Sequence, residues 1–589
     1  MVIRKLAKSI RQYLPSTIAT PLLVSGEVVL ECTIPFYMAE LVNRIKAGAG
    51  VGEIAGFGGI LAIMAIGSLL FGMLAGMTCA TASCGFGRNL RSDMYAAVND
   101  FSFDNIDSFS TSSLVTRMTT DVTNVQTAFM MMTRIAVRAP FMMIFAFIMA
   151  FRLGGGMAWI FVVVVPILAG TLIMVASKAM PLFKRIFKKY DKMNESIEEN
   201  IIGMRVVKSF VREEYEEQKF DGASEEVRRD FTKAEKILAW NAPVMQFCLY
   251  VVMIFVLSYG SYKVISTMGL DIDVGQITAL LTYGFMILSS LMMMSMIFVM
   301  ITLASESAAR IAEVLEAKSN IVSPDPETAV ESVADGSIEF SHVRFAYMGN
   351  PDNDVLSDIN LRIESGETVG IIGSTGSGKS SLVQLIPRLY DATGGQVKVG
   401  GVNVKDYDLD VLRKNVAMVL QKNVLFEGTI AENLRWGNPD ATLDDLKEAC
   451  RLACADEFIN SKDGEYDYRI DHGGANISGG QKQRLCIARA LLAKPKIIIF
   501  DDSTSAVDMK TDALIRKGMR EYIPETTKLI IAQRTASVMD ADKIVVIDQG
   551  RIVAVGTHDE LLNNSDIYRD IYMSQNSGSN EKGGDDDGR

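Results

Sequence analysis

The sequence lacks an excess of basic residues, and this absence argues against binding to nucleic acid. The 589 residues include 59 lysines and arginines against 70 aspartates and glutamates, which gives a formal net charge of −11. Proteins that bind nucleic acid usually carry a basic stripe or patch. We therefore expect no nucleic-acid partner.

The sequence also lacks any cysteine pattern typical of a zinc site or of a disulfide framework. Its seven cysteines are scattered, and neither kind of spacing is present among them. Cys450 and Cys454 stand four residues apart on a predicted helix, without a second pair to complete a metal site. Burial in a protein core is favoured for this pair, and reduced thiols that face the cytosol are the simplest interpretation of the whole set.

The composition is too apolar for a purely soluble protein and too charged for a purely membrane-embedded one. Hydrophobic residues make up 49% and charged residues 22%, and the mean hydropathy is +0.20. The length alone predicts several domains, at roughly 150 residues for each. A membrane part joined to a soluble part accounts for both numbers.

Six apolar segments precede residue 305, each near or above the ~20 residues that cross the hydrocarbon core. The first segment is too long for the apolar region of a signal peptide, and no A-x-A cleavage site follows it. The second–third and fourth–fifth connections are long, polar and helical in pattern. The segments cover approximately residues 16–42, 55–80, 127–151, 157–177, 240–265 and 277–304.

Basic residues predict which side of the membrane each connection faces. They cluster before the first segment and again in the connection between the fourth and the fifth. Because cytosolic loops are enriched in lysine and arginine, both regions are predicted to face the cytosol. The bias is incomplete, since four basic residues would lie outside: Arg44, Lys46, Arg152 and Lys263.

Four regions of the chain follow from these patterns. Residues 1–318 are predicted to form the membrane domain, and residues 319–336, which include Pro324 and Pro326, a polar linker. Strand and helix patterns then run over residues 337–573. The acidic tail, residues 574–589, has no apolar periodicity and is predicted to be disordered.

One run matches the phosphate-binding pattern G-x-x-x-x-G-K-[ST]. It follows an apolar strand, residues 367–372, and opens a helix, which is the context that this pattern requires. Backbone N–H groups and the helix N-terminus would surround the phosphates of ATP, Lys379 would reach the β- and γ-phosphates, and Ser380 would be a Mg²⁺ ligand. The residues of this phosphate loop are Gly373, Ser374, Thr375, Gly376, Ser377, Gly378, Lys379 and Ser380.

A second apolar strand, residues 497–500, ends in Asp501. A carboxylate at the end of a buried strand beside a phosphate loop is placed to hold Mg²⁺ through water. A role in capping the following helix is the alternative. The residues alone leave both interpretations open.

A short segment between these two sites reveals a family resemblance. Ser478, Gly479, Gly480 and Gln481 open a predicted helix, and together with the phosphate loop they resemble the signature of the ABC transporter family. The resemblance spans nearly the whole chain. It implies that two nucleotide domains pair head to tail, with each ATP held between the phosphate loop of one chain and the signature of the other.

The same resemblance assigns roles to single residues. Tyr347 resembles the aromatic residue that stacks on adenine, and Ser381 belongs to the same ATP-binding set. Gln421 resembles the glutamine that contacts Mg²⁺ and senses the membrane domain. Asp508 resembles the loop that crosses to the partner.

The membrane half resembles the exporter branch of the family. Residues 103–109 and 203–210 are similar to the cytosolic turns that dock on nucleotide domains. Six spans followed by one nucleotide domain is the exporter half-transporter layout. The expected fold is therefore an all-α six-helix membrane domain followed by a cytoplasmic α/β P-loop domain.

Two positions at the hydrolytic step depart from the family pattern. Asp502 stands where the family places the glutamate that activates the attacking water, and Gln533 stands where it places the switch histidine. The signature itself is intact. The chain therefore resembles the degenerate-site subunit of a heterodimer, whose partner would be a homologous half-transporter with that glutamate and histidine in place. A homodimeric exporter and an ATP-binding regulatory half that gates without driving transport are the alternatives.

Charged residues inside the predicted spans admit two interpretations. Glu27 and Glu31 share one face of the first span, and Arg134 and Arg138 share one face of the third. Charges at this depth are costly and are usually paired or face a cavity. A substrate or ion site is one interpretation, and a structural ladder of ion pairs is the favoured one.

The resemblance also implies a substrate class and a location. The expected substrates are amphiphiles such as drugs, lipids or peptides, moved out of the cytosol or the inner leaflet. The expected location is the plasma membrane of a bacterium, with the N-terminus and the ATP-binding domain in the cytoplasm. The fold does not fix which amphiphile is carried.

Overall fold

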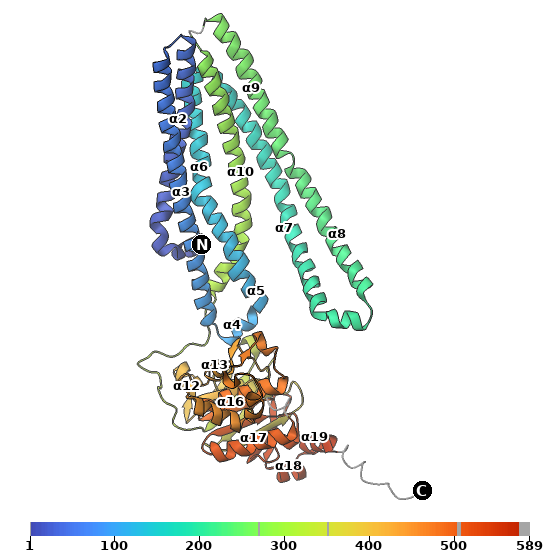
Figure 1. Cartoon of the computed structure of the whole chain (residues 1–589). Coiled ribbons are helices and arrows are strands. Elements are labelled where there is room, and N and C mark those ends of the chain that lie inside the picture. Colours follow the sequence, from blue (N-terminus) through green and yellow to red (C-terminus); the bar gives the residue numbers. More distant parts are fainter. Residues whose placement is uncertain (1, 269–270, 350–352, 503–507, 577–589) are drawn as a thin grey trace. The chain divides into compact units, whose positions relative to one another are not determined.

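The computed structural model describes residues 2–268, 271–349, 353–502 and 508–576. The chain forms two compact units (Figure 1). The first consists of Met1–Asn99 and Ser110–Ala317, and the second of Asp100–Phe109 and Lys318–Arg589. The short segment Asp100–Phe109 thus belongs to the second unit, although it lies within the first part of the sequence.

Long helices occupy all six predicted apolar segments. Several extend far beyond the membrane span, because the polar connections continue the helical pattern of the apolar segments. The short helices α1 (Val2–Leu6) and α5 (Thr111–Thr116) lie in the same unit. The long ones are α2 (Leu14–Lys46), α3 (Val51–Asn99), α6 (Val122–Gly154), α7 (Trp159–Ser209), α8 (Glu213–Leu238), α9 (Asn241–Ser266) and α10 (Val274–Glu316).

Within the described residues, five continuous helical stretches are long and apolar enough to cross a membrane. The third stretch, Thr111–Ser209, is 99 residues long and contains both the third and the fourth predicted segments. A 3₁₀ turn, Gly155–Ala158, joins α6 to α7 within this stretch. Gly155 has a φ of +48°, a conformation that side chains with a Cβ rarely adopt. The six apolar segments therefore lie in five helical stretches.

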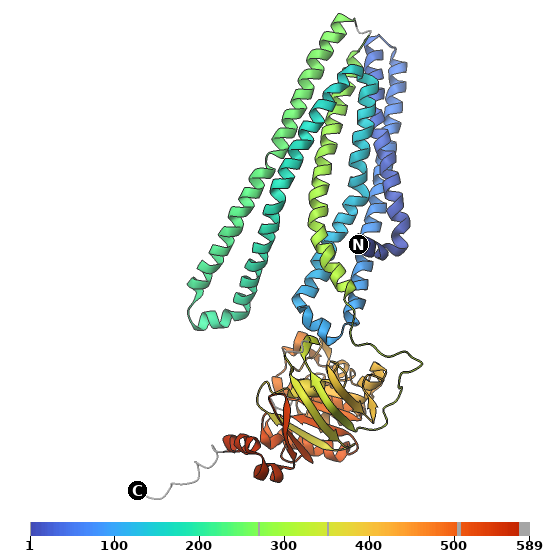
Figure 2. The ribbon, with the colours of Figure 1, turned by 180° about the vertical axis from the view of Figure 1, so that it is seen from behind.

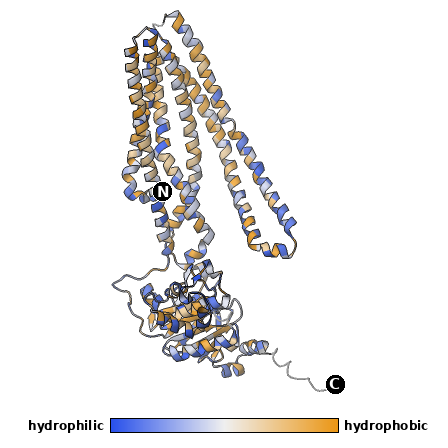
Figure 3. Cartoon of the chain, viewed as in Figure 1, coloured by the Kyte–Doolittle hydropathy of each residue, from blue (hydrophilic) through white to orange (hydrophobic). Residues whose placement is uncertain are grey.

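Helices α2, α3, α6 and α10 lie side by side, and α7 diverges from them together with α8 and α9 (Figures 1 and 2). Apolar residues predominate in the upper parts of the long helices, while polar residues dominate α8 (Figure 3). A buried hydrophobic cluster holds the bundle together and includes Val24, Phe161 and Leu280. The buried hydroxyl of Tyr283 donates to the carbonyl oxygen of Cys32 at 2.8 Å, which ties α10 to α2.

The second unit is built on a six-stranded sheet. Five neighbouring strands are parallel and the edge strand β12 is antiparallel. The parallel strands are almost wholly apolar because both faces of the sheet are covered. The order across the sheet is β12 (Arg551–Gly556), β11 (Lys543–Asp548), β3 (Thr368–Gly373), β10 (Thr527–Ile531), β9 (Ile497–Asp501) and β6 (Val416–Val419).

Smaller sheets and short helices complete this unit. An antiparallel sheet has the order β2 (Leu356–Ile363), β1 (Ile338–Phe345), β4 (Gly394–Val399) and β5 (Val402–Asn403), and β7 (Gly428–Thr429) pairs with β8 (Arg469–Ile470). The helices are α4 (Phe103–Ser108), α11 (Lys379–Gln384), α12 (Leu409–Asn415), α13 (Ile430–Leu434), α14 (Leu443–Leu452), α15 (Asp456–Asn460), α16 (Gly479–Leu492), α17 (Met509–Tyr522), α18 (His558–Asn564) and α19 (Asp566–Asn576).

The last helix continues into the segment predicted as a tail. Helix α19 ends at Asn576, and residues 577–589 lie outside the described residues. Gln575 anchors the end of this helix, since its Oε1 accepts the backbone N–H of Thr535 at 2.8 Å and its Nε2 donates to the carbonyl oxygen of Gln533 at 2.8 Å. The structured part of the chain therefore extends at least three residues past the predicted boundary.

Candidate functional site

The candidate site lies where four neighbouring strands end. In the parallel register, Ile531 of β10 pairs with Ile371 of β3 on one side and with Asp501 of β9 on the other. The carboxyl ends of parallel strands meet at one edge of a sheet, which is where ligands bind in open α/β folds. The phosphate loop follows β3, Gln533 follows β10, and Gln421 follows β6.

Two glycines give the phosphate loop its shape. A Cβ on Gly373 would lie 2.0 Å from the carbonyl oxygen of Ile547, so no other residue fits there. Gly378 has a φ of +97°, and a Cβ on it would lie 2.8 Å from Cδ2 of Leu356. These constraints leave the loop backbone free to face a phosphate group, and α11 begins directly after it.

The ammonium group of Lys379 lies inside the loop. Its Nζ donates to the carbonyl oxygens of Gly373 at 2.9 Å and Ser374 at 2.7 Å. Burial lowers the pKa of Lys379, while the nearby carboxylates of Asp502 and Asp501 act in the opposite direction. A partly buried cation that bonds only to neutral groups is well placed to receive an anionic phosphate.

Ser380 and Asp501 form the pair of oxygen ligands expected for Mg²⁺. The Oγ of Ser380 donates to Oδ1 of Asp501 at 2.8 Å. Asp501 is 4% exposed, and burial raises the pKa of its carboxyl group. A hydroxyl and a carboxylate are hard oxygen ligands, so these residues fit the ion. The N-cap of α17, the next described helix, is Asp508, whose carboxylate accepts the backbone N–H of Thr511 at 3.0 Å.

The two residues that depart from the family pattern contact each other. The Nε2 of Gln533 donates to Oδ2 of Asp502 at 2.6 Å, and the Nε2 of Gln421 lies 3.4 Å from the same oxygen. Burial raises the pKa of Asp502, and both amide hydrogen bonds oppose that shift. A glutamine amide donates a hydrogen bond but does not ionise near neutral pH as an imidazole does. The carboxylate is therefore held by two neutral amides.

Tyr347 connects the nucleotide site to a docking turn. Its hydroxyl is 2.9 Å from Oγ of Ser381, and its ring meets the ring of Tyr390 edge-on at 5.3 Å. The hydroxyl of Tyr390 donates to Oδ2 of Asp107 at 2.6 Å, and its ring lies 5.8 Å from that of Phe103. Asp107 and Phe103 both belong to α4, the turn at residues 103–109. Sequence analysis missed Tyr390, which belongs to no recognised motif.

The signature caps a helix and faces outward. Ser478 is the N-cap of α16, where its backbone N–H donates to Oε1 of Gln481 at 3.0 Å and its Oγ accepts the N–H of Gln481 at 3.4 Å. Ser478 and Gly479 are exposed, and a Cβ on Gly479 would meet no atom within 4 Å. Within the described residues, no hydrogen bond joins the signature to the phosphate loop of the same chain.

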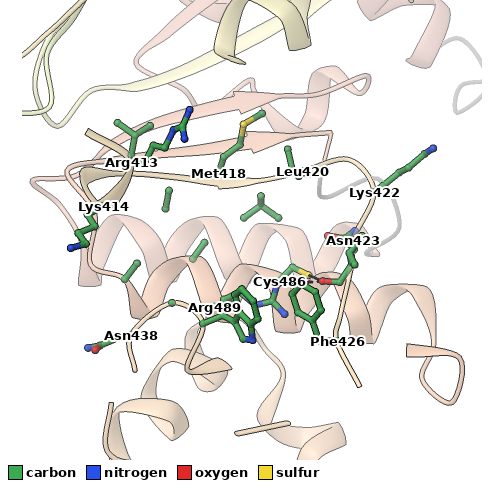
Figure 4. A pocket seen from close by; sticks show the side chains of 18 of the residues that line it. Arg413, Lys414, Met418, Leu420, Lys422, Asn423, Phe426, Asn438, Cys486 and Arg489 are labelled. Carbon is green, nitrogen blue, oxygen red and sulfur yellow. Dashed lines mark hydrogen bonds between the residues drawn. The ribbon is translucent and has the colours of Figure 1, made fainter. Parts of the chain in front are cut away.

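A groove of about 720 Å³ lies between β6 and α16 (Figure 4). Its apolar lining includes Phe426 and Trp436, whose rings stack at 4.4 Å, and Trp436 is 66% exposed. The segment after β6 that carries Gln421 also contributes Lys422 and Asn423 to the lining. One segment of the chain therefore both lines the groove and carries Gln421, a residue of the candidate nucleotide site.

Three of the four charged residues predicted inside the spans form one cluster. The guanidinium of Arg138 on α6 bonds to both carboxylates of α2, through Nη1 to Glu27 and through Nη2 to Glu31 at 2.8 Å. Glu27 is 6% exposed. Arg134 forms no ion pair with any described residue and lies beside Gly76 of α3. The structure thus brings together Glu27, Glu31 and Arg138 but does not pair Arg134.

Comparisons with known proteins agree with this arrangement. Residues 18–303 match the model of the ABC transporter transmembrane region, and residues 356–505 match the ABC transporter model. An uncharacterized ABC transporter ATP-binding protein of Bacillus subtilis is 33% identical over 554 residues, which cover 94% of this chain and 95% of that protein.

Two further matches concern function and fold. A protein of Mycobacterium bovis named as a fatty acid ABC transporter ATP-binding/permease protein is 32% identical, over 81% of this chain and 75% of that protein. The solved structure of a bacterial Atm1-family ABC exporter with ATP bound has a TM-score of 0.82, covers 96% of this chain and 98% of that one, and is 22% identical. This last likeness shows a shared fold.

The ion cluster on α2 and α6 gives a stability prediction. Arg138→Met leaves the buried Glu27 carboxylate and the half-buried Glu31 carboxylate without their cation. Breaking a buried pair costs about 3–5 kcal/mol. We expect a clearly lower thermal midpoint for the purified chain in detergent, and recovery of most of it when Glu27→Gln and Glu31→Gln are added. Arg134→Met is the matched control and should change the midpoint little. Equal midpoints for Arg138→Met and Arg134→Met would contradict this account.

Proposed function

This chain belongs to the ABC transporter family, and from that premise we propose that it is the degenerate-site half of a heterodimeric exporter. The family and the exporter fold establish an ATP-hydrolysing transporter that combines a membrane domain with an ATP-binding domain. The finer proposal is that this chain binds ATP at a weakened site of its own. Its intact signature would complete the competent site of a partner that has the usual glutamate and histidine.

The contact between Gln533 and Asp502 carries this proposal. An aspartate is one carbon–carbon bond shorter than a glutamate, about 1.5 Å, and misplacement of a reacting group by about 1 Å can cost roughly 10²-fold in rate. The histidine that the family places at position 533 would supply a donor that stabilises the transition state, and loss of one such donor costs ~3 kcal/mol. Both losses affect the same step, so they do not simply add.

ATP binding does not depend on those two positions. Tyr347 offers an aromatic face for the adenine, the phosphate loop offers backbone N–H groups and Lys379, and Ser380, Asp501 and Gln421 are the residues that would hold Mg²⁺. Bound Mg²⁺ would neutralise charge on the phosphates. Each of these residues is of the expected type, so we propose that this chain retains ATP without efficient hydrolysis.

The outward-facing signature supports a role in the partner's site. The Ser478 hydroxyl and the first N–H groups of α16 lie at a helix N-terminus, where they attract an anion. Because they face outward, a phosphate bound to a second chain can reach them. We propose that Asp508, at the N-cap of α17, likewise belongs to the surface that meets the partner.

We propose that the partner's cytosolic turn occupies the groove between β6 and α16. The equivalent turn of this chain, at the end of α7, presents large apolar side chains to solvent, with Phe210 73% exposed and Ile202 77% exposed. These exposed side chains can pack into an apolar groove on another molecule. The second turn, α4, packs on its own nucleotide domain through Tyr390 and Asp107.

The proposed substrate is an amphiphile moved outward through the membrane unit. The long apolar helices place this unit in a lipid bilayer, and we propose the plasma membrane of a bacterium. The relative named for fatty acid transport is similar over most of both chains. This similarity favours a lipid-like molecule among the amphiphiles.

The isolated chain should bind ATP and Mg²⁺ yet turn ATP over slowly. Asp502 and Gln533 weaken its site, while the binding residues are present. Nucleotide binding and phosphate release by the purified chain test this expectation, with Lys379→Ala as the control that lowers binding. Robust turnover by the chain alone, lost in Lys379→Ala, would overturn the degenerate-site proposal.

Restoring the family residues should restore activity at this chain's own site. In the assembled heterodimer, Asp502→Glu returns the reach of the carboxylate, but Gln533 still cannot act as an imidazole. We therefore expect a modest gain in ATP turnover for Asp502→Glu and a larger gain when Gln533→His is added. No change in the double variant would place the limit elsewhere, for example in the partner's signature.

Damage to the signature should stop chemistry at the partner's site. Gly479→Asp places a bulky negative charge where the partner's phosphate approaches, so ATPase activity and transport should both be lost while this chain still binds ATP. The change should leave the fold intact, because the space beside Gly479 is empty. Lys379→Ala should instead weaken ATP binding at this chain's own phosphate loop and leave some ATP hydrolysis at the partner's site.

Gly479→Asn is the matched control, since it has the size of aspartate without the charge. It should impair turnover less than Gly479→Asp does. Nucleotide occupancy and ATPase rate in the heterodimer separate the two roles. Intact turnover in Gly479→Asp together with complete loss in Lys379→Ala would contradict the proposed division of labour.

A further inference from the structure

The groove between β6 and α16 is strongly basic as well as apolar. Its lining contains no aspartate or glutamate and four cationic side chains: Arg413, Lys414, Lys422 and Arg489. Figure 4 shows all four around the same hollow. A docked segment would therefore meet cations on several sides.

None of these four cations forms an ion pair with a carboxylate in the described part of the chain. The guanidinium of Arg489 donates to the carbonyl oxygens of Asn433 at 2.9 Å and Val424 at 3.3 Å. That of Arg413 donates to the carbonyl oxygen of Arg388 at 2.9 Å. Burial lowers the pKa of both arginines. Partly desolvated cations with neutral partners favour the approach of an anion.

The cytosolic turn at the end of α7 carries positive charge, as the groove does. Residues 203–212 contain Arg205, Lys208 and Arg212 and no acidic residue. All three basic side chains are exposed. Among the described residues, only Lys208 of the three has a carboxylate within 4 Å, with its Nζ 3.5 Å from Oε1 of Glu213. Two copies of this chain would therefore bring a basic turn to a basic groove.

We infer that this groove selects a partner whose docking turn is apolar and acidic, and that it rejects a second copy of this chain. The inference rests on the proposed pairing of half-transporters and adds the chemistry that chooses the partner. Phe426 and Trp436 receive the apolar side chains. The buried Oδ1 of Asn423, which has no hydrogen-bond partner within the described residues, accepts an N–H of the docked turn. Like charges brought together at an interface suppress the wrong partner.

Cross-linking between two tagged copies of the full chain tests this selection. One copy carries Ser209→Cys in its turn, and the other carries Leu420→Cys in the groove. The yield of disulfide-linked, doubly tagged dimer is measured after mild oxidation in detergent, at low and at high salt. The yield is compared between the natural turn and an acidic turn that carries Arg205→Glu and Lys208→Glu together. Copies with only one of the two cysteines give the background.

We expect little cross-linking for the natural turn and a several-fold higher yield for the acidic turn. High salt should remove most of that gain, because salt shortens the range of charge interactions. Lys414→Glu with Lys422→Glu in the groove should in turn admit the natural basic turn. The matched control is Arg229→Glu with Lys233→Glu on α8, which makes the same change in net charge away from the turn and should give no gain.

Two results would overturn the selection by charge. One is an equal yield for the natural and the acidic turn, and the other is an acidic turn that never cross-links to the groove. ATPase measurements on the same samples separate this inference from the proposed function. If natural copies cross-link efficiently and hydrolyse ATP, and if Lys379→Ala abolishes that hydrolysis, both the charge selection and the degenerate-site proposal are overturned. Efficient cross-linking without turnover would overturn only the charge selection and leave the degenerate-site proposal standing.

Discussion

The parallel pairing of β3, β10, β9 and β6 is the constraint on which the nucleotide site depends. The strands are paired in register, so that Ile531 aligns with Ile371 on one side and with Asp501 on the other. The segments that follow these strands therefore reach the same edge of the sheet. Burial of apolar side chains on both faces fixes this register. A slip of one residue would turn Asp501 toward the opposite face.

Within this frame, the proposed function assigns the weakening of one step, hydrolysis, to Asp502 and Gln533. The Gln533 amide donates to the Asp502 carboxylate at 2.6 Å, so a neutral donor lies where the family pattern has an imidazole. The signature, by contrast, keeps its capping serine and an open approach at Gly479. The altered residues belong to this chain's own hydrolytic site, whereas the signature that would face a partner keeps the family pattern. This combination supports the proposal that two different half-transporters have different roles. The basic groove and the basic turn extend this asymmetry to the choice of partner.

Local patterns predicted much of this site because its chemistry is local in sequence. The phosphate loop needs glycines at fixed spacing, and the structure shows steric reasons at Gly373 and Gly378. The fold class predicted from the sequence is confirmed by the family models and by the shared exporter fold. The apolar segments predicted long helices, although a 3₁₀ turn joins two of them into one continuous stretch.

Contacts between distant residues could not be predicted in this way. The hydrogen bond of Tyr390 to Asp107 spans 283 positions, and although Asp107 lies in a predicted docking turn, no pattern marks Tyr390. The bonds of Gln575 to the switch segment likewise depend on where α19 folds back. Spacing alone placed Arg134 and Arg138 together, but only Arg138 reaches the two glutamates, because packing of α6 against α2 decides which side chain faces them.

Identification of the nucleotide held at each site during turnover tests the central claim most directly. The assembled heterodimer is trapped with orthovanadate while it hydrolyses labelled ATP, and the nucleotide bound to each chain is then determined. The account predicts trapped ADP at the partner's phosphate loop and intact ATP at the loop that contains Lys379. Equal amounts of trapped ADP at both loops would contradict it.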